Sequence, residues 1–404
     1  MPKKQYDIIT CHPAKHHFYE QAHAISQKYD IRFLTSVFIN PIWLKLIKPF
    51  SKKIYQFLSK KSHSKLASKY VITHPATELE IMRKKLRKQN YNYYEGNRKF
   101  EHWVIKNFMP PKVFIGVDTA CGYIFSQWKN KSFLILDLVI ALPQYRNKVY
   151  QAAIDENPNL KPKDFHFSTE PELSIYKQEI ELADLILCGS EFVKSSCLDY
   201  GIPESRLKVI EYGVDLDLFN PTPNLQKNGK FKMAFVGNFS VRKGSILIEQ
   251  LMKNLENYGD IELHVFGKAD KASKAKFGSN TFFHGFIPQQ ELKEKLELCD
   301  MMVFPTYFEG SAYAVYQSMS LSLPVITTPN CGSVVDESCG IIIPVNNIHA
   351  LEEAVMRLYA DKELRLELGK NAHVKAQNYS WENYGEKIRQ VIATALEKHP
   401  EKLV

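Results

Sequence analysis

The chain has 404 residues, of which 45% are hydrophobic and 24% charged, and its formal net charge is +9. This composition excludes a disordered chain. The length exceeds one ordinary hydrophobic core, so two domains are predicted. The seven cysteines include no CxxC pair, so their spacing does not indicate a zinc site, and free thiols in a reducing cytoplasm are expected.

Neither a secretory signal nor a membrane span is expected. The N-terminal apolar run is too short for a signal, and the best candidate for a span, 133–142, is short and contains Asp137. The basic excess is local, because 16 of the 53 Lys and Arg residues but only 4 of the 44 Asp and Glu residues lie between Trp43 and Asn107. Any attraction to an anionic partner is therefore expected in this segment.

The first half of the chain alternates buried strands with helices, the pattern of a parallel sheet covered on both faces. Helices are expected, for instance, at 172–183 and 191–200. The expected strands are 6–11, 31–36, 112–117, 132–139, 184–189 and 207–212.

Residues 43–61 have the pattern of a basic amphipathic helix, which Pro49 would kink or split. The lysines of this segment lie mostly on the other faces. The apolar face comprises Trp43, Leu46, Ile47, Phe50, Ile54 and Phe57. Such a helix is typical of a membrane-surface element. The alternative is a helix packed on the sheet with a solvated basic face. The first interpretation predicts that segment 43–107 contacts an anionic membrane.

A polar stretch rich in turn-forming residues, 220–230, is expected to link the first sheet to a second one. The final segment, 380–398, has an apolar stripe at helical spacing. The strands expected in the second sheet are 231–237, 261–267, 281–284, 300–304, 324–327 and 341–343.

Two loops at strand ends have the composition of a ligand site. The first, 237–244, contains Arg242 and Lys243 and opens a helix. Two cations beside free N–H groups and a positive helix dipole suit a phosphate or pyrophosphate. The alternative is that both cations are solvated turn residues.

The second loop contains Glu309 between the strand ending at Phe304 and a helix expected near Ser311. Ligands bind at the carboxyl ends of strands in such sheets. Gly310 permits close backbone approach, and Glu309 can accept hydrogen bonds from sugar hydroxyls. The alternative role for Glu309 is a helix cap.

These segments together resemble the retaining glycosyltransferases of family 4, which have the GT-B fold: two Rossmann-like parallel-sheet domains with the active site in the interdomain cleft. The resemblance covers about half of the chain, 184–379. The segments that show it are Ser190–Lys194, Tyr212–Asp215, Phe235–Gly237 with Arg242–Gly244, and Phe308–Gly310 through Leu323–Ile326.

The resemblance implies catalytic roles for Arg242 and Lys243, which neutralise the departing diphosphate, and for Glu309, which holds the donor sugar. Position 317 would meet the ribose, and 283–287 the base. No metal and no cofactor is implied beyond a nucleotide-diphosphate sugar as donor substrate. The donor-binding residues implied are Gly237, Asn238, Gly310, Ser311, Ala312, Gln317, Phe286 and Ile287.

The sequence departs from the family pattern at three places. Asn238 stands where an Arg is common, and Gln317 replaces the family's second Glu. The N-terminal glycine pair is replaced by a loop containing Lys15 and His17, which resembles a variant of one bacterial subgroup. These two residues either face the cleft or are exposed first-turn residues.

Asp118 and Asp137, near strand ends, are candidates to line the acceptor side of the cleft, with structural carboxylates as the alternative. The domains expected are 1–212, which would bind the acceptor, and 213–380, which would bind the donor, with helix 381–404 packing back on the first. The expected function is transfer of a sugar from a UDP- or GDP-sugar to a carbohydrate or lipid-linked carbohydrate acceptor in cell-surface glycan synthesis. The alternatives are a nucleotide-sugar epimerase of the same fold and a non-catalytic binder of nucleotide sugars or RNA. No nucleic-acid partner is expected under the main hypothesis, and the location would be cytoplasmic or peripheral on the inner face of the cell membrane.

Overall fold

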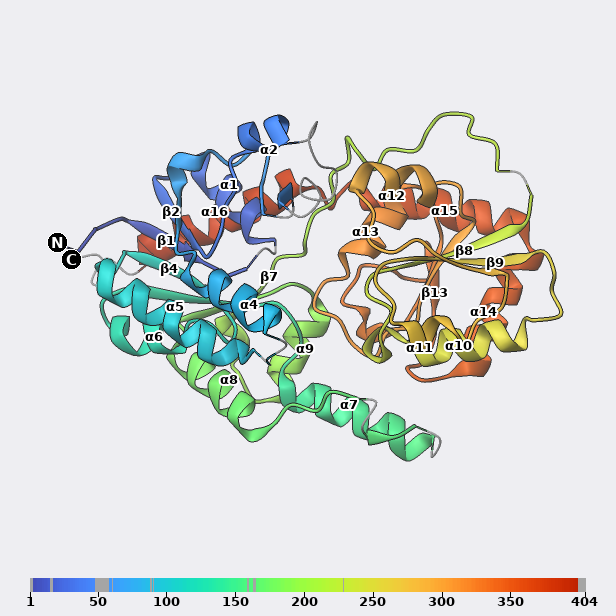
Figure 1. The fold of residues 1–404 in the computed structure, drawn as a ribbon, viewed down its shortest axis with the longest axis horizontal. Coiled ribbons are helices and arrows are strands. Elements are labelled where there is room, and N and C mark those ends of the chain that lie inside the picture. Colours follow the sequence, from blue (N-terminus) through green and yellow to red (C-terminus); the bar gives the residue numbers. More distant parts are fainter. Residues whose placement is uncertain are drawn as a thin grey trace.

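Two parallel sheets, each covered by helices, lie side by side in the computed structural model (Figure 1). The structure describes residues 3–14, 17–47, 58–59, 61–87, 89, 91–157, 160–162, 165–227 and 229–398.

The N-terminal sheet has seven strands in the order β3-β2-β1-β4-β5-β6-β7, and all of its described pairings are parallel. Its central strand β4 is apolar throughout, and all five of its residues are buried because helices cover both faces of the sheet. The strands are β1 (Ile8–Cys11), β2 (Ile31–Thr35), β3 (Val71–Thr73), β4 (Val113–Val117), β5 (Phe133–Leu138), β6 (Leu185–Cys188) and β7 (Leu207–Val209).

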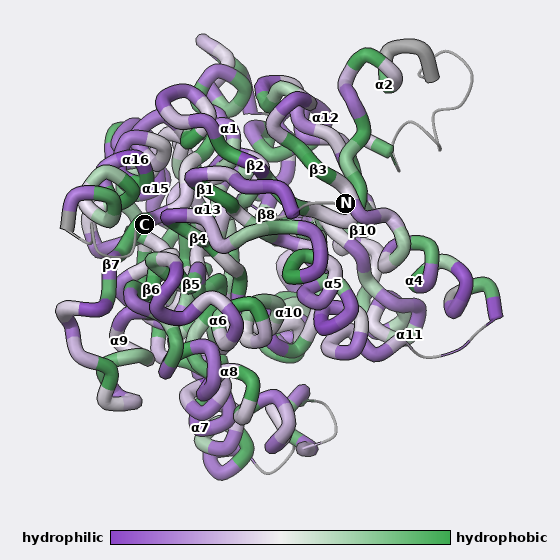
Figure 2. Tube along the Cα trace, turned by 90° about the vertical axis from the view of Figure 1, so that its left-hand side faces the viewer, coloured by the Kyte–Doolittle hydropathy of each residue, from purple (hydrophilic) through white to green (hydrophobic). Residues whose placement is uncertain are grey.

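The helices of this domain begin at residues that suit helix starts. Asn92 accepts from the Glu95 amide at the start of α5, and Ser190 accepts from the Val193 amide at the start of α9. Apolar residues of the strands and of the helix faces that cover them form the hydrophobic interior (Figure 2). The helices are α1 (Phe18–Ser26), α2 (Pro41–Ile47), α4 (Ala76–Leu86), α5 (Tyr93–Asn107), α6 (Gly122–Trp128), α7 (Pro143–Glu156), α8 (Glu170–Leu182) and α9 (Glu191–Asp199).

The C-terminal sheet has six parallel strands in the order β10-β9-β8-β11-β12-β13. These are β8 (Phe231–Val236), β9 (Ile261–Phe266), β10 (Thr281–Phe283), β11 (Met301–Phe304), β12 (Val325–Thr327) and β13 (Gly340–Ile342). Its helices are α10 (Ser245–Asn254), α11 (Lys271–Lys274), α12 (Gln289–Leu296), α13 (Tyr313–Ser320), α14 (Ile348–Ala360) and α15 (Lys362–Ala376).

The chain crosses between the domains twice, and the two crossings lie against each other. Val214 and Ser380 form an isolated parallel β-bridge. A Cβ at Gly213 would collide with the Ser380–Trp381 backbone, which explains the glycine there. The last helix, α16 (Trp381–Lys398), then packs on α1 of the N-terminal domain, where Arg389 donates to the Gln27 side chain at 2.8 Å.

The fold class predicted from the sequence is confirmed, and an observed strand lies within or beside each strand expected. Strand β3 was missed because it is three residues long, only partly buried and at the sheet edge. Of the amphipathic segment 43–61, residues 48–57 and 60 lie outside the described residues. Among the helices that are described, none has the length and apolar character needed to cross a bilayer.

Candidate functional site

The site lies where the strand order of the C-terminal sheet reverses, between β8 and β11. The chain runs from β8 to β9 and β10 on one side and from β11 to β12 and β13 on the other. At such a switch point the two connecting loops diverge and leave a crevice at the carboxyl ends of the strands. Here the loop after β8 leads to α10, and the loop after β11, residues 305–312, leads to α13.

The first loop holds two cations over the end of the sheet. Arg242 and Lys243 form a short 3-10 helix with Val241, and Gly244 follows with a positive φ of 85°. A Cβ at Gly244 would collide with the Pro305 carbonyl, so a glycine brings the two loops together. Tyr307 N–H donates to the Arg242 carbonyl at 2.8 Å and fixes their mutual position.

Glu309 forms ion pairs with both cations. Its Oε1 lies 2.5 Å from Arg242 Nη1 and 3.1 Å from Lys243 Nζ. Arg242 Nη1 also donates to the Phe308 carbonyl at 3.0 Å. Glu309 is 9% exposed. Two formal positive charges therefore face one negative charge in a largely buried cluster. A buried charge that has counter-charges is tolerated, and the unbalanced positive charge suits an anionic ligand.

The backbone beside Glu309 presents three amides. Within the described residues, the N–H groups of Gly310, Ser311 and Ala312 have no hydrogen-bond acceptor. They precede α13, which begins at Tyr313 rather than near Ser311 as expected. Free amides at a helix N-terminus suit an anion or a sugar hydroxyl.

The expected ribose and base positions lie near each other. Gln317 is 2% exposed and donates to the Gln289 side chain at 2.5 Å. Gln289 starts α12, two residues after Ile287. Phe286 is 51% exposed, Ile287 packs on the core, and Asn238 is exposed. The structure thus brings Gln317 next to the end of segment 283–287, with its amide engaged by a second side chain.

His17 and Asp137 form a buried pair at the end of the N-terminal sheet. His17 Nε2 lies 2.9 Å from Asp137 Oδ2, and Gln21 donates to the same oxygen at 2.7 Å. The His17 ring stacks on Tyr212 with centroids 4.2 Å apart. His17 is 6% exposed, so the alternative of an exposed first-turn residue is wrong for it. Lys15 lies outside the described residues.

Asp118 has the contacts of a structural carboxylate. It accepts from the hydroxyl of Tyr176 on α8 and from the Val139 amide at 3.3 Å. Burial raises its pKa to about 6, while both hydrogen bonds oppose that rise. These contacts favour the structural alternative for Asp118.

Sequence reasoning missed the aromatic contacts that join the two domains at this site. A hydrophobic cluster contains Tyr150, Phe165, Tyr307 and Phe308, from both domains. The Ser190 hydroxyl donates to the Gly310 carbonyl at 2.5 Å. The only signal in the sequence was the density of aromatic residues between 145 and 167, which has no spacing that predicts a partner.

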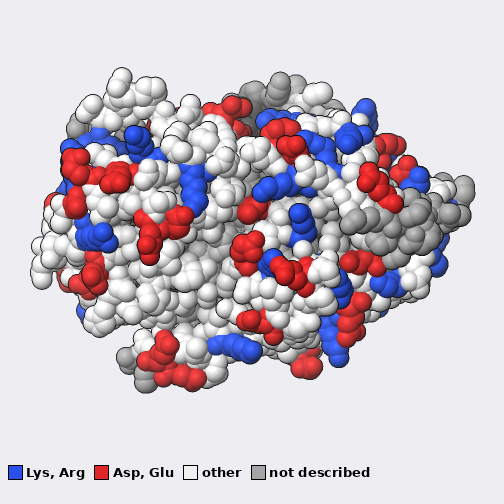
Figure 3. Space-filling view, turned by 180° about the vertical axis from the view of Figure 1, so that it is seen from behind, with Lys and Arg blue, Asp and Glu red and all other residues white. Residues whose placement is uncertain are grey.

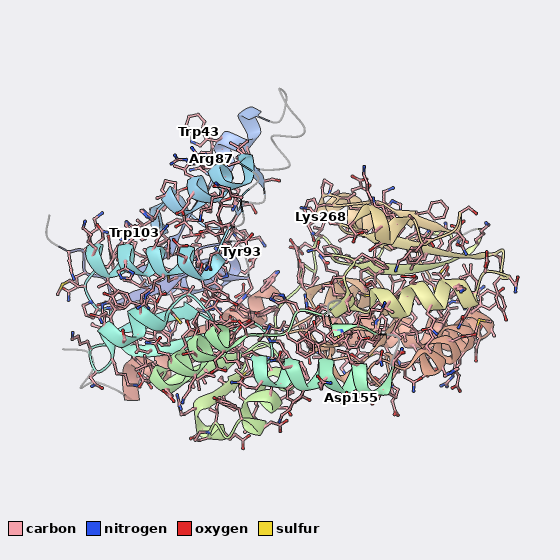
Figure 4. All side chains as sticks on the ribbon, turned by 60° about the horizontal axis from the view of Figure 1, so that its bottom comes forward. Trp43, Arg87, Tyr93, Trp103, Asp155 and Lys268 are labelled. Carbon is pink, nitrogen blue, oxygen red and sulfur yellow. The ribbon has the colours of Figure 1, made fainter. Side chains whose placement is uncertain are left out.

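Charge elsewhere is mixed. On the face in Figure 3, basic and acidic side chains are interspersed over both domains. Figure 4 shows Lys268, which follows β9, on the edge of the C-terminal domain nearest the N-terminal domain.

Comparison with known proteins matches the C-terminal domain to a family. Residues 219–375 match the family described as Glycosyl transferases group 1. An uncharacterized glycosyltransferase of Methanocaldococcus jannaschii is 27% identical over 224 residues, which are 54% of this chain and 61% of that protein. The chain thus spans less than two thirds of the length of this relative.

Two solved structures share the whole architecture. Sucrose-phosphate synthase from Thermosynechococcus elongatus has a TM-score of 0.71 at 17% identity, covering 97% of this chain and 99% of that one. The Anabaena protein HepE in complex with UDP has a TM-score of 0.62 at 14% identity, with the same coverage. Residues 219–375 are thus a glycosyl transferases group 1 domain, and the chain as a whole has the GT-B fold of two parallel-sheet domains.

Proposed function

We propose that this protein is a retaining glycosyltransferase that uses a nucleotide-diphosphate sugar, a UDP- or GDP-sugar, as donor. The observation that carries the proposal is the cluster of Arg242, Lys243 and Glu309 beside the free amides of residues 310–312. Two cations with one carboxylate keep a net positive charge where a diphosphate would bind. The family match and the UDP bound to the Anabaena neighbour support the same ligand class.

The proposed chemistry needs no group beyond the chain and its substrates. The bond between the anomeric carbon and the diphosphate oxygen breaks while Arg242 and Lys243 neutralise the charge on the leaving group. The acceptor hydroxyl forms the new bond on the same face, and its proton passes to the departing phosphate oxygen. Glu309 and the adjacent amides hold the sugar as positive charge develops on its ring. The side chains at the pyrophosphate take the place of a metal ion, so activity in EDTA is expected to equal activity without it.

The acceptor is proposed to be a carbohydrate or lipid-linked carbohydrate at an anionic membrane surface, as in cell-surface glycan synthesis. Ile42 and Trp43 of α2 are 66% and 61% exposed. Leu79 and Leu86 of α4 are 61% and 85% exposed, on a helix that contains Arg83. Helices α2 and α4 project from the same side of the N-terminal domain (Figure 2). Apolar side chains among basic ones suit an anionic lipid surface.

The donor proposal is tested by thermal unfolding in the presence of UDP-, GDP-, ADP-, CMP- and dTDP-sugars. A ligand that binds only the folded state raises its stability, so one sugar nucleotide is expected to raise Tm. That donor, radiolabelled in its sugar, is then incubated with the protein. Transfer and hydrolysis release the nucleotide, whereas epimerisation changes the sugar without releasing it. A folded protein that none of these donors stabilises would overturn the proposal.

The membrane proposal is tested by sedimentation with phosphatidylglycerol vesicles. Binding at low salt and release at high salt are expected, because salt screens the attraction. Trp43→Ser with Leu86→Ser should weaken binding. Leu366→Ser, at an exposed leucine of the other domain, is the matched control. Equal binding of all three proteins, or none by the wild type, contradicts this part.

A further inference from the structure

Helix α7 belongs to the N-terminal domain but lies beneath the C-terminal one. It starts after β5 and extends under the second domain (Figures 1 and 4), where Asp155 marks its far end. Its inner face packs on the β11–α13 loop. The Tyr150 ring lies 4.8 Å from the Phe308 ring and 6.0 Å from the Tyr307 ring, centroid to centroid. Tyr150, Tyr307 and Phe308 are each at most 3% exposed.

A polar contact ties the same two elements together. The Tyr307 hydroxyl donates to Asn346 Oδ1 at 2.8 Å, and Asn346 Nδ2 donates to the Ala153 carbonyl of α7 at 3.2 Å. Asn346 has a positive φ of 60°, a conformation that Asn and Gly adopt more readily than other residues. One amide side chain thus bridges α7 to the residue two positions before Glu309.

The other end of this loop also rests on the N-terminal domain. Ser190, the first residue before α9, donates to the Gly310 carbonyl at 2.5 Å. A Cβ at Gly310 would collide with the carbonyl oxygen of Val139, which follows β5. The residues on both sides of Glu309 are therefore held by the N-terminal domain, although Glu309 belongs to the C-terminal one.

We propose that Tyr150 is a positioning residue: by packing on Phe308 it sets the position of Glu309 across the domain boundary. The sugar-binding carboxylate is then in place only while the domains are docked, whereas the backbone of Arg242 and Lys243 belongs to the loop after β8 of the C-terminal sheet. The sugar role of Glu309 rests on the proposed function, but the packing role of Tyr150 does not. A side chain that is packed on its neighbours has less positional freedom than one that is not. Loss of the Tyr150 ring should therefore disturb the loop around Glu309 more than it disturbs the cations that would bind the phosphates.

The first test is hydrogen–deuterium exchange of the ligand-free protein at the hydrogen-bonded amides of the loop, those of Thr306, Tyr307 and Glu309. Tyr150→Ala is expected to speed exchange there by at least ~10-fold, because the loop loses buried contacts. Tyr150→Phe keeps the ring and should exchange like the wild type. Tyr145→Ala is the matched control, since its ring lies on the same helix but contacts Phe192. Asn346→Gly keeps the left-handed backbone, removes the bridge and should also speed exchange.

The second test is calorimetric binding of UDP and of whichever sugar nucleotide stabilises the protein. In Tyr150→Ala the affinity for UDP should stay within about threefold of wild type, while the sugar nucleotide loses ~10-fold or more. Wild-type exchange in Tyr150→Ala would overturn the proposal. Faster exchange in a protein that binds no sugar nucleotide would instead count against the proposed function and leave the positioning contact intact.

Discussion

Three buried glutamates, Glu309 of the C-terminal domain and Glu101 and Glu179 of the N-terminal domain, are held in contrasting ways. Glu309, at the edge of the C-terminal sheet, has two cations within 3.1 Å. Glu101 and Glu179 of the N-terminal domain accept instead from backbone amides. Burial raises their pKa values to about 7 and about 8. A carboxylate that accepts from backbone amides stabilises a helix start or a turn. Two cations around one carboxylate instead leave a net positive charge that a ligand can use. Among these three glutamates, the partners separate the candidate site from the helix and turn supports.

The largest effect is expected from Glu309→Gln. The amide keeps the shape of the side chain but removes the charge that would stabilise the sugar as it becomes cationic, so turnover should fall by ~10²–10³-fold. Removing a negative charge beside the two cations should leave UDP binding equal or tighter. Steady-state kinetics and calorimetry measure the two effects. A variant with near-normal turnover would reduce Glu309 to a structural partner of Arg242.

Substitution of Glu101 is expected to change stability rather than turnover. Its carboxylate accepts from the Tyr123 amide at 2.5 Å. Because its pKa is higher in the folded state, its contribution to stability is complete below about pH 4.5 and is lost as pH rises through about 7. The loss amounts to about 3 kcal/mol, and Glu101→Gln should remove it. Urea unfolding at pH 5 and pH 8 measures this, with the more exposed Glu95→Gln of the same helix as control. Identical pH dependence in wild type and Glu101→Gln would show that Glu101 is already ionised when folded.

The cations of the C-terminal site give the next prediction. Lys243→Ala removes one charge-assisted contact, worth about 1.5–3 kcal/mol, so the Kd for UDP should rise by ~10–150-fold. Lys253→Ala, at an exposed lysine of α10 in the same domain, is the matched control and should bind UDP as the wild type does. If Lys243→Ala also binds UDP normally, the diphosphate does not lie on the loop 237–244.

Local patterns in the sequence predicted the parts of the site that depend on neighbours along the chain. Apolar runs indicated the strands, and glycine with cations after one strand, and with an acid after another, indicated the two loops. Parallel topology then placed both loops at one sheet edge. The direct ion pair of Arg242 with Glu309 could not be predicted, because it depends on how Gly244 packs on Pro305.

Contacts between the domains were beyond sequence reasoning for a different reason. Tyr150 and Phe308 are far apart in sequence, and a buried aromatic residue has the same local pattern whether it packs in its own domain or on another. His17 posed the same difficulty, since only the fold shows that it lies against Asp137. Family resemblance covered the donor half well and offered little for these positions.

The smallest effect is expected at Gln317, where the family pattern has a carboxylate. A carboxylate accepts from both ribose hydroxyls, whereas the amide has one acceptor oxygen and no charge. In the structure Gln317 Nε2 donates to Gln289 Oε1 at 2.5 Å. Gln317→Glu loses that donor, but Gln289 can turn its own amide to the new carboxylate, which restores the contact.

Gln317→Glu should therefore bind the sugar nucleotide equally or more tightly, by up to about 1 kcal/mol, with little change in stability. Calorimetry with the nucleotide and with the free base and diphosphate separates a ribose contact from a general charge effect. Gln289→Ala provides the control, because it removes the partner without altering position 317. Weaker binding in Gln317→Glu, with Gln289→Ala unaffected, would mean that a second acid near Glu309 repels the diphosphate and that the neutral amide at 317 is matched to this site.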